Sequence, residues 1–246
     1  MNGLVATRLI PRSYSKVKRL IAPTQYANPN LTIAANFVSS RNIEGDYYEF
    51  GLYRGASFAC AYHELTHARR SMLAYHQAKG LPVPKDLVNS TRFYGFDSFE
   101  GLPEPLNLDK LPSHWEIGQF RCSYDEFLSN ISRAGVDLSE VHIIQGLFSS
   151  TLNPGVKKTY LMSKASIVHV DCDLYESTLD VLEFIRDLLV DGSVIIFDDW
   201  FGFKGNPSYG EQRAFREWSE KYGVLSSELS RFNGQSVAFI IHGDTD

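Results

Sequence analysis

Five strand-like runs in this sequence are each closed by a carboxylate, an amide or a glycine, and helix-like runs lie between them. The strand-like runs cover residues 46–50, 92–96, 141–145, 166–170 and 193–197. Alternating strands and helices are typical of a parallel sheet covered by helices, because parallel strands require a crossover connection. The carboxyl ends of parallel strands lie at one edge of a sheet, where ligands bind in open α/β folds. The sequence therefore predicts an α/β fold with a polar site along that edge.

Helix signals fill the connections between these runs. We expect helices over 56–79, 124–133, 177–191 and 209–221. The first contains neither glycine nor proline and is followed by Gly80, a residue typical of helix C-termini. The third has Ser177 near its start and Gly192 after its end. Asn233-Gly234 ahead of a strand over 237–241 predicts an antiparallel hairpin at the C-terminal end of a mostly parallel sheet.

The composition excludes several classes of function. The chain of 246 residues has 24 Lys and Arg against 29 Asp and Glu, a net charge of -5, which argues against nucleic acid as a partner. No apolar run reaches the roughly 18 residues that a membrane span requires, so we expect no membrane partner. Cys60, Cys122 and Cys172 are too few and too scattered for a disulfide framework, and we expect a cytoplasmic protein.

The first 43 residues differ in charge from the rest of the chain. No Asp or Glu precedes Glu44, although six Lys and Arg residues do. We interpret residues 1–43 as an arm that forms a lid or a contact between the subunits of a homo-oligomer, and residues 44–246 as one domain. An organelle transit peptide has a similar acid-poor composition and is the alternative interpretation.

The first strand-like run leads into a turn with two glycines, Gly51 and Gly55. Such a strand-to-helix turn allows the backbone to approach a ligand and exposes helix N-terminal amides. The turn lacks the third glycine of the usual dinucleotide-binding pattern. A plain tight turn without a ligand is the alternative.

Asp97 closes the second strand-like run. A carboxylate at that place can accept hydrogen bonds from the ribose hydroxyls of a nucleoside. The alternative is that Asp97 only caps the following loop.

Two acidic pairs, Asp171 with Asp173 and Asp198 with Asp199, directly follow the fourth and fifth strand-like runs. Neighbouring strands lie about 4.8 Å apart, so oxygen atoms from both pairs can meet one hard cation such as magnesium. The alternative is that these aspartates solvate loops and cap helices. His169, flanked by valines, is interpreted as a core histidine with satisfied hydrogen bonds.

Four blocks of this sequence together resemble the macrocin-type (TylF-type) O-methyltransferases of macrolide and sugar modification. The blocks are Glu49-Phe-Gly-Leu-Tyr-Arg-Gly-Ala-Ser57, Phe93-Tyr-Gly-Phe-Asp-Ser-Phe-Glu-Gly-Leu-Pro103, Val170-Asp-Cys-Asp-Leu-Tyr-Glu-Ser-Thr178 and Ile195-Ile-Phe-Asp-Asp199. The resemblance implies a Rossmann-like class I methyltransferase fold, a mostly parallel seven-stranded sheet with helices on both faces and the C-terminal hairpin.

The resemblance also implies an activity and a site. The activity is S-adenosylmethionine-dependent O-methylation of a small molecule, with Mg²⁺ or another divalent cation. The acceptor would be a sugar or diol hydroxyl in a natural-product or glycan pathway. The resemblance assigns the metal to Asp171, Asp198 and Asp199 and the role of general base to Asp171. Together with the glycine turn, it assigns the cofactor to Glu49, Gly51, Tyr53, Gly55, Ser57, Asp97 and Ser98.

Two other functions compete with this expectation. A nicotinamide-dependent oxidoreductase uses a related sheet, but the missing third glycine and the doubled acidic pairs argue against it. A non-catalytic scaffold of the same fold is the other alternative. Clustered carboxylates destabilise a fold, so we do not expect a scaffold that binds no ligand to contain them.

Overall fold

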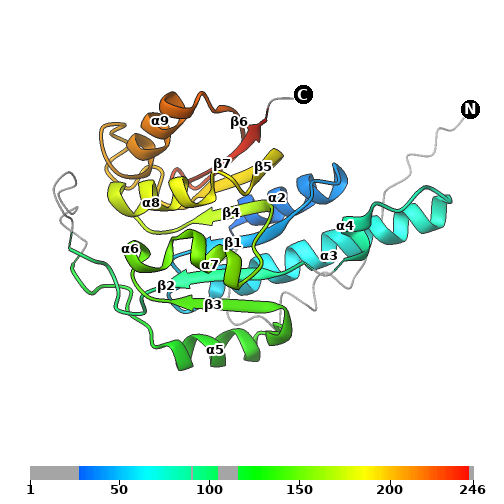
Figure 1. Cartoon of the computed structure of the whole chain (residues 1–246), viewed down its shortest axis with the longest axis horizontal. Helices are drawn as coiled ribbons and strands as arrows, with labels where there is room; N and C mark the ends of the chain where they lie inside the picture. The colour runs from blue at the N-terminus through cyan, green and yellow to red at the C-terminus, as the bar shows by residue number, and fades with distance from the viewer. Residues whose placement is uncertain (1–27, 90, 105–115, 244–246) are drawn as a thin grey trace, which may run out of the picture.

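The computed structural model describes residues 28–89, 91–104 and 116–243, and it contains one mixed sheet. The sheet has the strand order β3-β2-β1-β4-β5-β7-β6 (Figure 1). The strands are β1 (Asp46–Phe50), β2 (Phe93–Asp97), β3 (Val141–Gln145), β4 (Ala165–Val170), β5 (Leu189–Phe197), β6 (Leu225–Phe232) and β7 (Ser236–His242).

The pairing of these strands confirms the predicted topology. Strands β1 to β5 are parallel, with Tyr48 paired to Tyr94 on one side of β1 and to Val168 on the other. Strand β7 runs antiparallel to β5 and forms the C-terminal hairpin with β6. The order reverses between β1 and β4, so a crevice is expected beside the carboxyl ends of these two strands.

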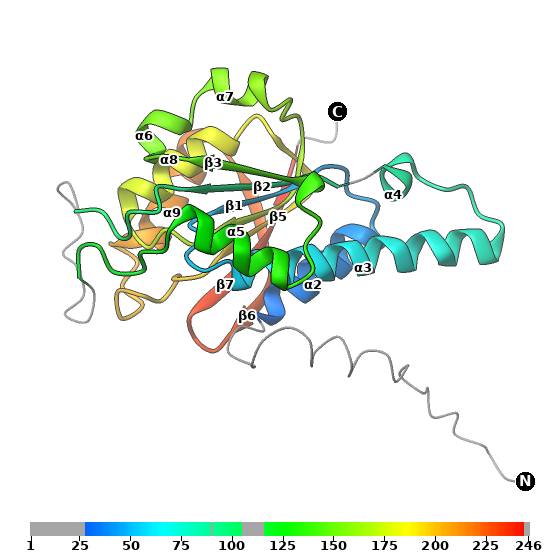
Figure 2. The same cartoon turned by 90° about the horizontal axis from the view of Figure 1, so that it is seen from below.

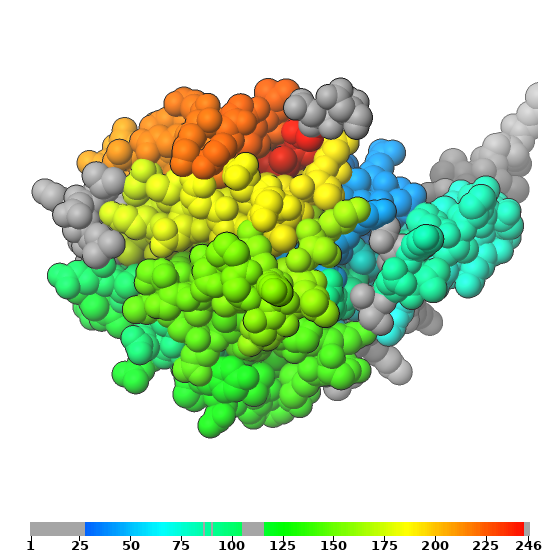
Figure 3. All heavy atoms as spheres, in the orientation of Figure 1, coloured from blue at the N-terminus to red at the C-terminus, as the bar shows by residue number. Residues whose placement is uncertain are grey.

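Helices cover both faces of the sheet, as expected. Helices α2, α3 and α5 lie on one face, and α6, α7, α8 and α9 lie on the other (Figure 2). The side chains of α6 to α8 close over the face shown in Figure 3. The bounds are α2 (Pro29–Ser40), α3 (Ala56–Lys79), α4 (Lys85–Val88), α5 (Tyr124–Arg133), α6 (Phe148–Thr151), α7 (Pro154–Thr159), α8 (Tyr175–Ile185) and α9 (Gly210–Tyr222). In the described parts of the chain, no helix is both long and apolar enough to cross a bilayer.

Each face of the sheet has its own apolar core. One core joins alternate strand residues such as Tyr47 and Ile167 to Phe58 of α3. The other joins Tyr48 and Val168 to Trp218 of α9. Successive strand residues point to opposite faces of the sheet. Because helices cover both faces, both sets of residues are apolar, and the strands form continuous apolar runs in the sequence.

The helix expected to end at Gly192 is shorter than predicted. Helix α8 begins at Tyr175, two residues before Ser177, and ends at Ile185. Gly192 lies within β5 with φ +86°, and a Cβ there would lie 2.5 Å from Cδ1 of Ile43. The glycine is therefore required by its left-handed backbone within β5, beside the side chain of Ile43, and it does not end a helix.

The described part of the predicted arm contains helix α2. Its residues Leu31, Ala34 and Val38 are buried in the same core as α3. Pro29 occupies the first turn of α2 and Asn28 is its N-cap, an arrangement that suits proline because the first-turn amide has no partner in a helix. Residues 1–27 lie outside the described residues, and the division of the chain at residue 43 stays a prediction.

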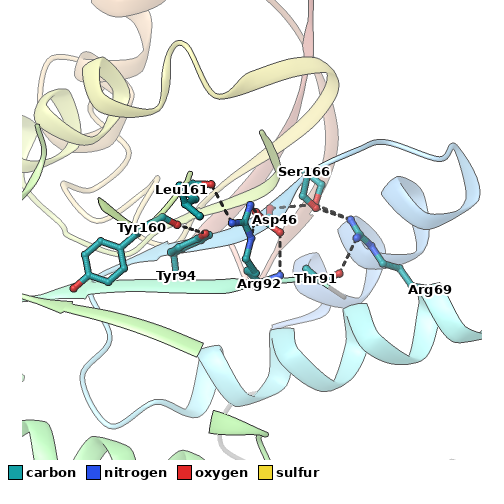
Figure 4. Close-up of polar contacts among 9 residues, drawn as sticks. Asp46, Arg69, Thr91, Arg92, Tyr94, Tyr160, Leu161 and Ser166 are labelled. Atoms are coloured by element: carbon teal, nitrogen blue, oxygen red, sulfur yellow. Dashed lines mark hydrogen bonds and ion pairs between the residues drawn. The ribbon is translucent and has the colours of Figure 1, made fainter. Parts of the chain in front are cut away.

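The amino ends of the central strands are joined by a network of arginine contacts (Figure 4). Arg92 of the chain before β2 donates from Nη2 to Oδ2 of Asp46, at 2.7 Å, and from Nη1 to the carbonyl of Leu161. Arg69 of α3 is buried and donates to Oγ1 of Thr91 and to the carbonyl of Gly45. The Arg92–Asp46 pair joins opposite charges at this end of the sheet, whereas Asp171, Asp198 and Asp199 converge at the opposite end.

Candidate active site

A cavity of about 400 Å³ opens at the carboxyl ends of the parallel strands. Its volume is within the range of small-molecule sites. Of the predicted site residues, Gly51, Tyr53, Asp97, Ser98, Asp171, Asp198 and Asp199 line it. The other lining residues are Leu52, Gly101, Leu102, Pro103, Glu104, Phe120, Gly146, Leu147, Phe148, Ser149, Cys172, Asp173, Leu174, Glu176, Ser177, Asp180 and Gln235.

Gly51 follows β1 and lies against the backbone that follows β4. A Cβ at this position would lie 1.7 Å from the carbonyl oxygen of Asp171, and the backbone has φ +89°. The amide of Asp171 donates to the carbonyl of Phe50 at 2.8 Å. Only glycine fits both the conformation and the space, so the turn is held against the acidic strand end.

The carboxylate of Asp97 organises the same turn. Its Oδ2 accepts hydrogen bonds from the amides of Leu52 and Tyr53, at 2.7 and 3.2 Å, and its Oδ1 accepts one from Phe99, at 2.7 Å. A carboxylate has about four acceptor directions, so one on Oδ1 is left for a ligand hydroxyl. Ser98 accepts a hydrogen bond from the amide of Glu100.

Glu49, Gly55 and Ser57 lie behind the cavity wall and do not line it. Glu49 is fully buried and accepts hydrogen bonds from Tyr47 and from Oγ of Ser57. Gly55 faces α5, where a Cβ would lie 2.6 Å from Cγ2 of Ile131. These three residues shape the turn from within the protein.

Asp171, Asp198 and Asp199 converge on one point. One carboxylate oxygen from each lies within 4.8 Å of the other two, and among the described residues this is the group suited to a metal ion. Three carboxylates are a hard, all-oxygen donor set of the kind that Mg²⁺ and Mn²⁺ prefer. The donor set fits a divalent cation.

The electrostatics of the cluster favour a cation. Burial, reinforced by Asp198, raises the pKa of Asp171 well above its ordinary value. Burial and then Asp199 do the same for the pKa of Asp173, which lines the cavity but lies outside the converging group. Burial and neighbouring negative charges disfavour the ionised form of these carboxyl groups, and a bound cation would favour that form instead.

Three residues outside the predicted site set lie behind the acidic cluster, and two of them donate hydrogen bonds to it. Asn28 donates from Nδ2 to Oδ1 of Asp198 at 2.9 Å, and Gln235 donates from Nε2 to Oδ1 of Asp199 at 3.1 Å. His169 is buried, but its ring nitrogens lie 3.7 Å from Glu49 and 3.6 Å from Asp198 without a hydrogen bond.

His169 is therefore a core histidine, as expected, but the expectation that its hydrogen bonds are satisfied was wrong. Burial opposes its protonation, but the two facing carboxylates raise its pKa well above the ordinary value. A proton on His169 places a positive charge behind the cluster.

Glu211 in the first turn of α9 is a further buried carboxyl group beside this cluster. It is 1% exposed, and neither of its oxygens has a hydrogen-bond partner. Burial, reinforced by Asp199 and Asp198, raises the pKa of Glu211 well above its ordinary value. The folded protein therefore keeps this proton to a higher pH than the unfolded chain does.

We expect Glu211→Gln to flatten the pH dependence of stability. A raised carboxyl pKa means that stability is lost as the pH rises from the ordinary glutamate value, about 4.3, through the folded value. The melting temperature of the metal-free protein, measured at about pH 5.5 and about pH 8, should fall less in the variant than in the wild type.

Glu217→Gln is the matched control for this measurement. Hydrogen bonds from Tyr175 and Arg213 lower the pKa of Glu217, so its contribution is lost only on acidification. An equal fall in melting temperature for Glu211→Gln and wild type would contradict the prediction.

The chain is similar to proteins of known activity. The 8-demethyl-8-(2,3-dimethoxy-alpha-L-rhamnosyl)-tetracenomycin-C 4'-O-methyltransferase of Streptomyces olivaceus is 25% identical over 236 residues. The match covers 94% of this chain and 78% of that protein.

Solved structures share the fold. CalS11, a calicheamicin methyltransferase, aligns with a TM-score of 0.62 at 19% identity, covering 94% of this chain and 91% of CalS11. An O-methyltransferase from Bacillus cereus in complex with SAH aligns with a TM-score of 0.53 at 14% identity, covering 96% and 94% of the two chains. These alignments confirm the expected class I methyltransferase fold.

The similarity extends to a whole family. The sequence model of macrocin-O-methyltransferase (TylF) matches residues 27–237, a range that includes the glycine turn, Asp97 and both acidic pairs. The chain therefore belongs to the macrocin O-methyltransferase (TylF) family and is an O-methyltransferase, as its four sequence blocks indicated.

Proposed function

We propose that this enzyme transfers the methyl group of S-adenosylmethionine to a sugar or diol hydroxyl of a natural product, with the help of a divalent cation. The convergence of three carboxylates at the edge of a cavity, beside a glycine turn, is the observation that carries the proposal. The relative from Streptomyces olivaceus is named for O-methylation of a compound that carries a rhamnosyl group, which supports a sugar acceptor.

The cofactor would lie along the first two strand ends. Gly51, Tyr53, Asp97 and Ser98 line that part of the cavity and would contact it. Asp97 would accept a ribose hydroxyl through Oδ1, since Oδ2 already holds two backbone amides. Glu49, Gly55 and Ser57 would act indirectly, by fixing the shape of the turn.

The cation would be held by Asp171, Asp198 and Asp199. Magnesium, when bound, would supply charge that lowers the pKa of an acceptor hydroxyl and orients two neighbouring oxygens. Asp171 would accept the proton that the hydroxyl loses. The cavity walls would hold the reactants in attack geometry, which is a large part of catalysis by such sites.

The proposal predicts cofactor binding that depends on Asp97. We expect S-adenosylhomocysteine to bind the wild type at micromolar concentration in isothermal titration. Asp97→Ala is expected to weaken this binding roughly 10- to 100-fold, because hydrogen bonds to a charged group contribute about 1.5–3 kcal/mol. The expected loss of affinity includes the hydrogen bond to the ribose and the hydrogen bonds by which Asp97 orders the turn.

Titrations with and without magnesium, followed by methyl-transfer assays on sugar and catechol acceptors, complete the test. Asp137→Ala, at an exposed site on another loop, is the control for Asp97→Ala. Binding of NADH in place of S-adenosylhomocysteine would overturn the proposal in favour of an oxidoreductase.

A further inference from the structure

Asn28 connects the start of helix α2 to the acidic cluster. Its side chain is 6% exposed and makes two kinds of contact. Oδ1 accepts a hydrogen bond from the amide of Asn30, at 3.0 Å, and so caps α2. Nδ2 donates to Oδ1 of Asp198, at 2.9 Å, and lies 3.4 Å from Oγ of Ser236.

The contact fixes which oxygen of Asp198 faces the protein. Oδ1 receives the hydrogen bond from Asn28 and also lies 3.6 Å from Nε2 of His169. Gln235 makes the equivalent contact to Asp199, through Oδ1. Asp198 is therefore held through Oδ1, so its other oxygen can be directed to a ligand.

We infer that Asn28 is a positioning residue for the cation site: it holds Asp198 in the orientation in which this carboxylate meets Asp171 and Asp199. The inference rests on the proposed function, since it concerns the cation proposed there. Three carboxylates that converge repel one another, and a neutral donor behind one of them offsets part of that repulsion without competing for the cation. Outer hydrogen bonds of this kind orient metal ligands, and their loss typically costs 10- to 100-fold in metal affinity.

The two tasks of Asn28 use different atoms and can be separated. Capping requires only a side-chain acceptor, which serine also provides, and Asn and Ser are similarly favourable N-caps. The contact with Asp198 requires the amide donor at the end of the side chain. Asn28→Ser is therefore expected to keep α2 in place while it removes the hydrogen bond to Asp198.

Titration of the full-length protein with Mn²⁺, followed by electron paramagnetic resonance of the free ion, tests the inference. We expect Asn28→Ser to weaken Mn²⁺ binding about 10- to 100-fold. Its affinity for S-adenosylhomocysteine should stay within about twofold of wild type, because the glycine turn and Asp97 are untouched. Should Asn28→Ser fold poorly by thermal melting, Asn28→Thr, a second capping variant, takes its place.

Asn30→Ser is the matched control. Asn30, two residues further along the chain, is fully buried, and its side chain hydrogen-bonds to Ser236 and Ser230 rather than to an aspartate of the cluster. The Asn30→Ser variant should have a lower melting temperature than the wild type but the same affinity for Mn²⁺.

Each outcome decides between the proposals. Wild-type Mn²⁺ affinity in Asn28→Ser, or equal loss in Asn28→Ser and Asn30→Ser, would overturn the positioning role and leave the proposed function standing. If the wild type itself binds no Mn²⁺, the metal-assisted function is overturned and the positioning role with it.

Discussion

Asp171→Asn is expected to lower kcat about a thousandfold while leaving the affinity for S-adenosylhomocysteine almost unchanged. General bases contribute roughly 10²- to 10⁴-fold to catalysis, and this variant would remove the proposed base and a proposed cation ligand together. The residues proposed to contact the cofactor include Gly51 and Asp97, and the hydrogen bonds of Asp97 do not involve the Asp171 side chain, so binding should persist. Single-turnover methyl transfer and isothermal titration measure the two quantities separately.

Asp173→Asn is the comparison that makes this result specific. Asp173 lines the same cavity but does not belong to the converging group, so its replacement should cost far less activity. Excess chelator should also inactivate the wild type, and added magnesium should restore it. Full activity in Asp171→Asn, or in the presence of chelator, would remove the metal-assisted mechanism.

Gly51→Ala is expected to have the largest effect on stability. The added Cβ would lie 1.7 Å from the carbonyl oxygen of Asp171, which is backbone and cannot rotate away. The residue also has φ +89°, which disfavours any side chain. We expect a loss of more than about 4 kcal/mol in the free energy of unfolding, measured by urea denaturation.

Gly80→Ala separates the steric effect from the conformational one. Gly80 follows α3 with φ +62°, and a Cβ there would meet no atom within 4 Å. Alanine at this position should cost only about 1–2 kcal/mol, the ordinary penalty for a left-handed residue. Equal losses in the two variants would show that the contact with Asp171 does not determine the shape of the turn.

Local sequence patterns determined the elements and the place of the site. Helices α3 and α5 and strands β1 and β3 have the predicted bounds, because their helix-forming or strand-like runs end at glycines, polar residues or turns. The polar residues that close the strands had to gather at one edge, since parallel strands end on the same side of a sheet. The C-terminal hairpin likewise followed from its Asn-Gly turn.

The role of each side chain was decided only by the tertiary structure. Gly192 follows a helix-like run, as a glycine at a helix end would, but it supplies the positive φ that β5 adopts beside Ile43. Gly55 belongs to the glycine turn in sequence, but its Cα faces helix α5. Local propensity is a weak guide at such positions, because the constraint comes from a neighbouring segment.

The hydrogen bond between Asn28 and Asp198 joins residues 170 positions apart. The pattern Asn28-Pro29 signals the start of a helix, but it carries no information about the carboxylate that the helix end will meet. That contact depends on how α2 packs across the sheet beside α3. Local sequence patterns predict a sheet with an acidic edge. The groups that surround this edge are fixed by the packing of α2, α9 and the terminal hairpin, because such contacts form only when distant segments are brought together.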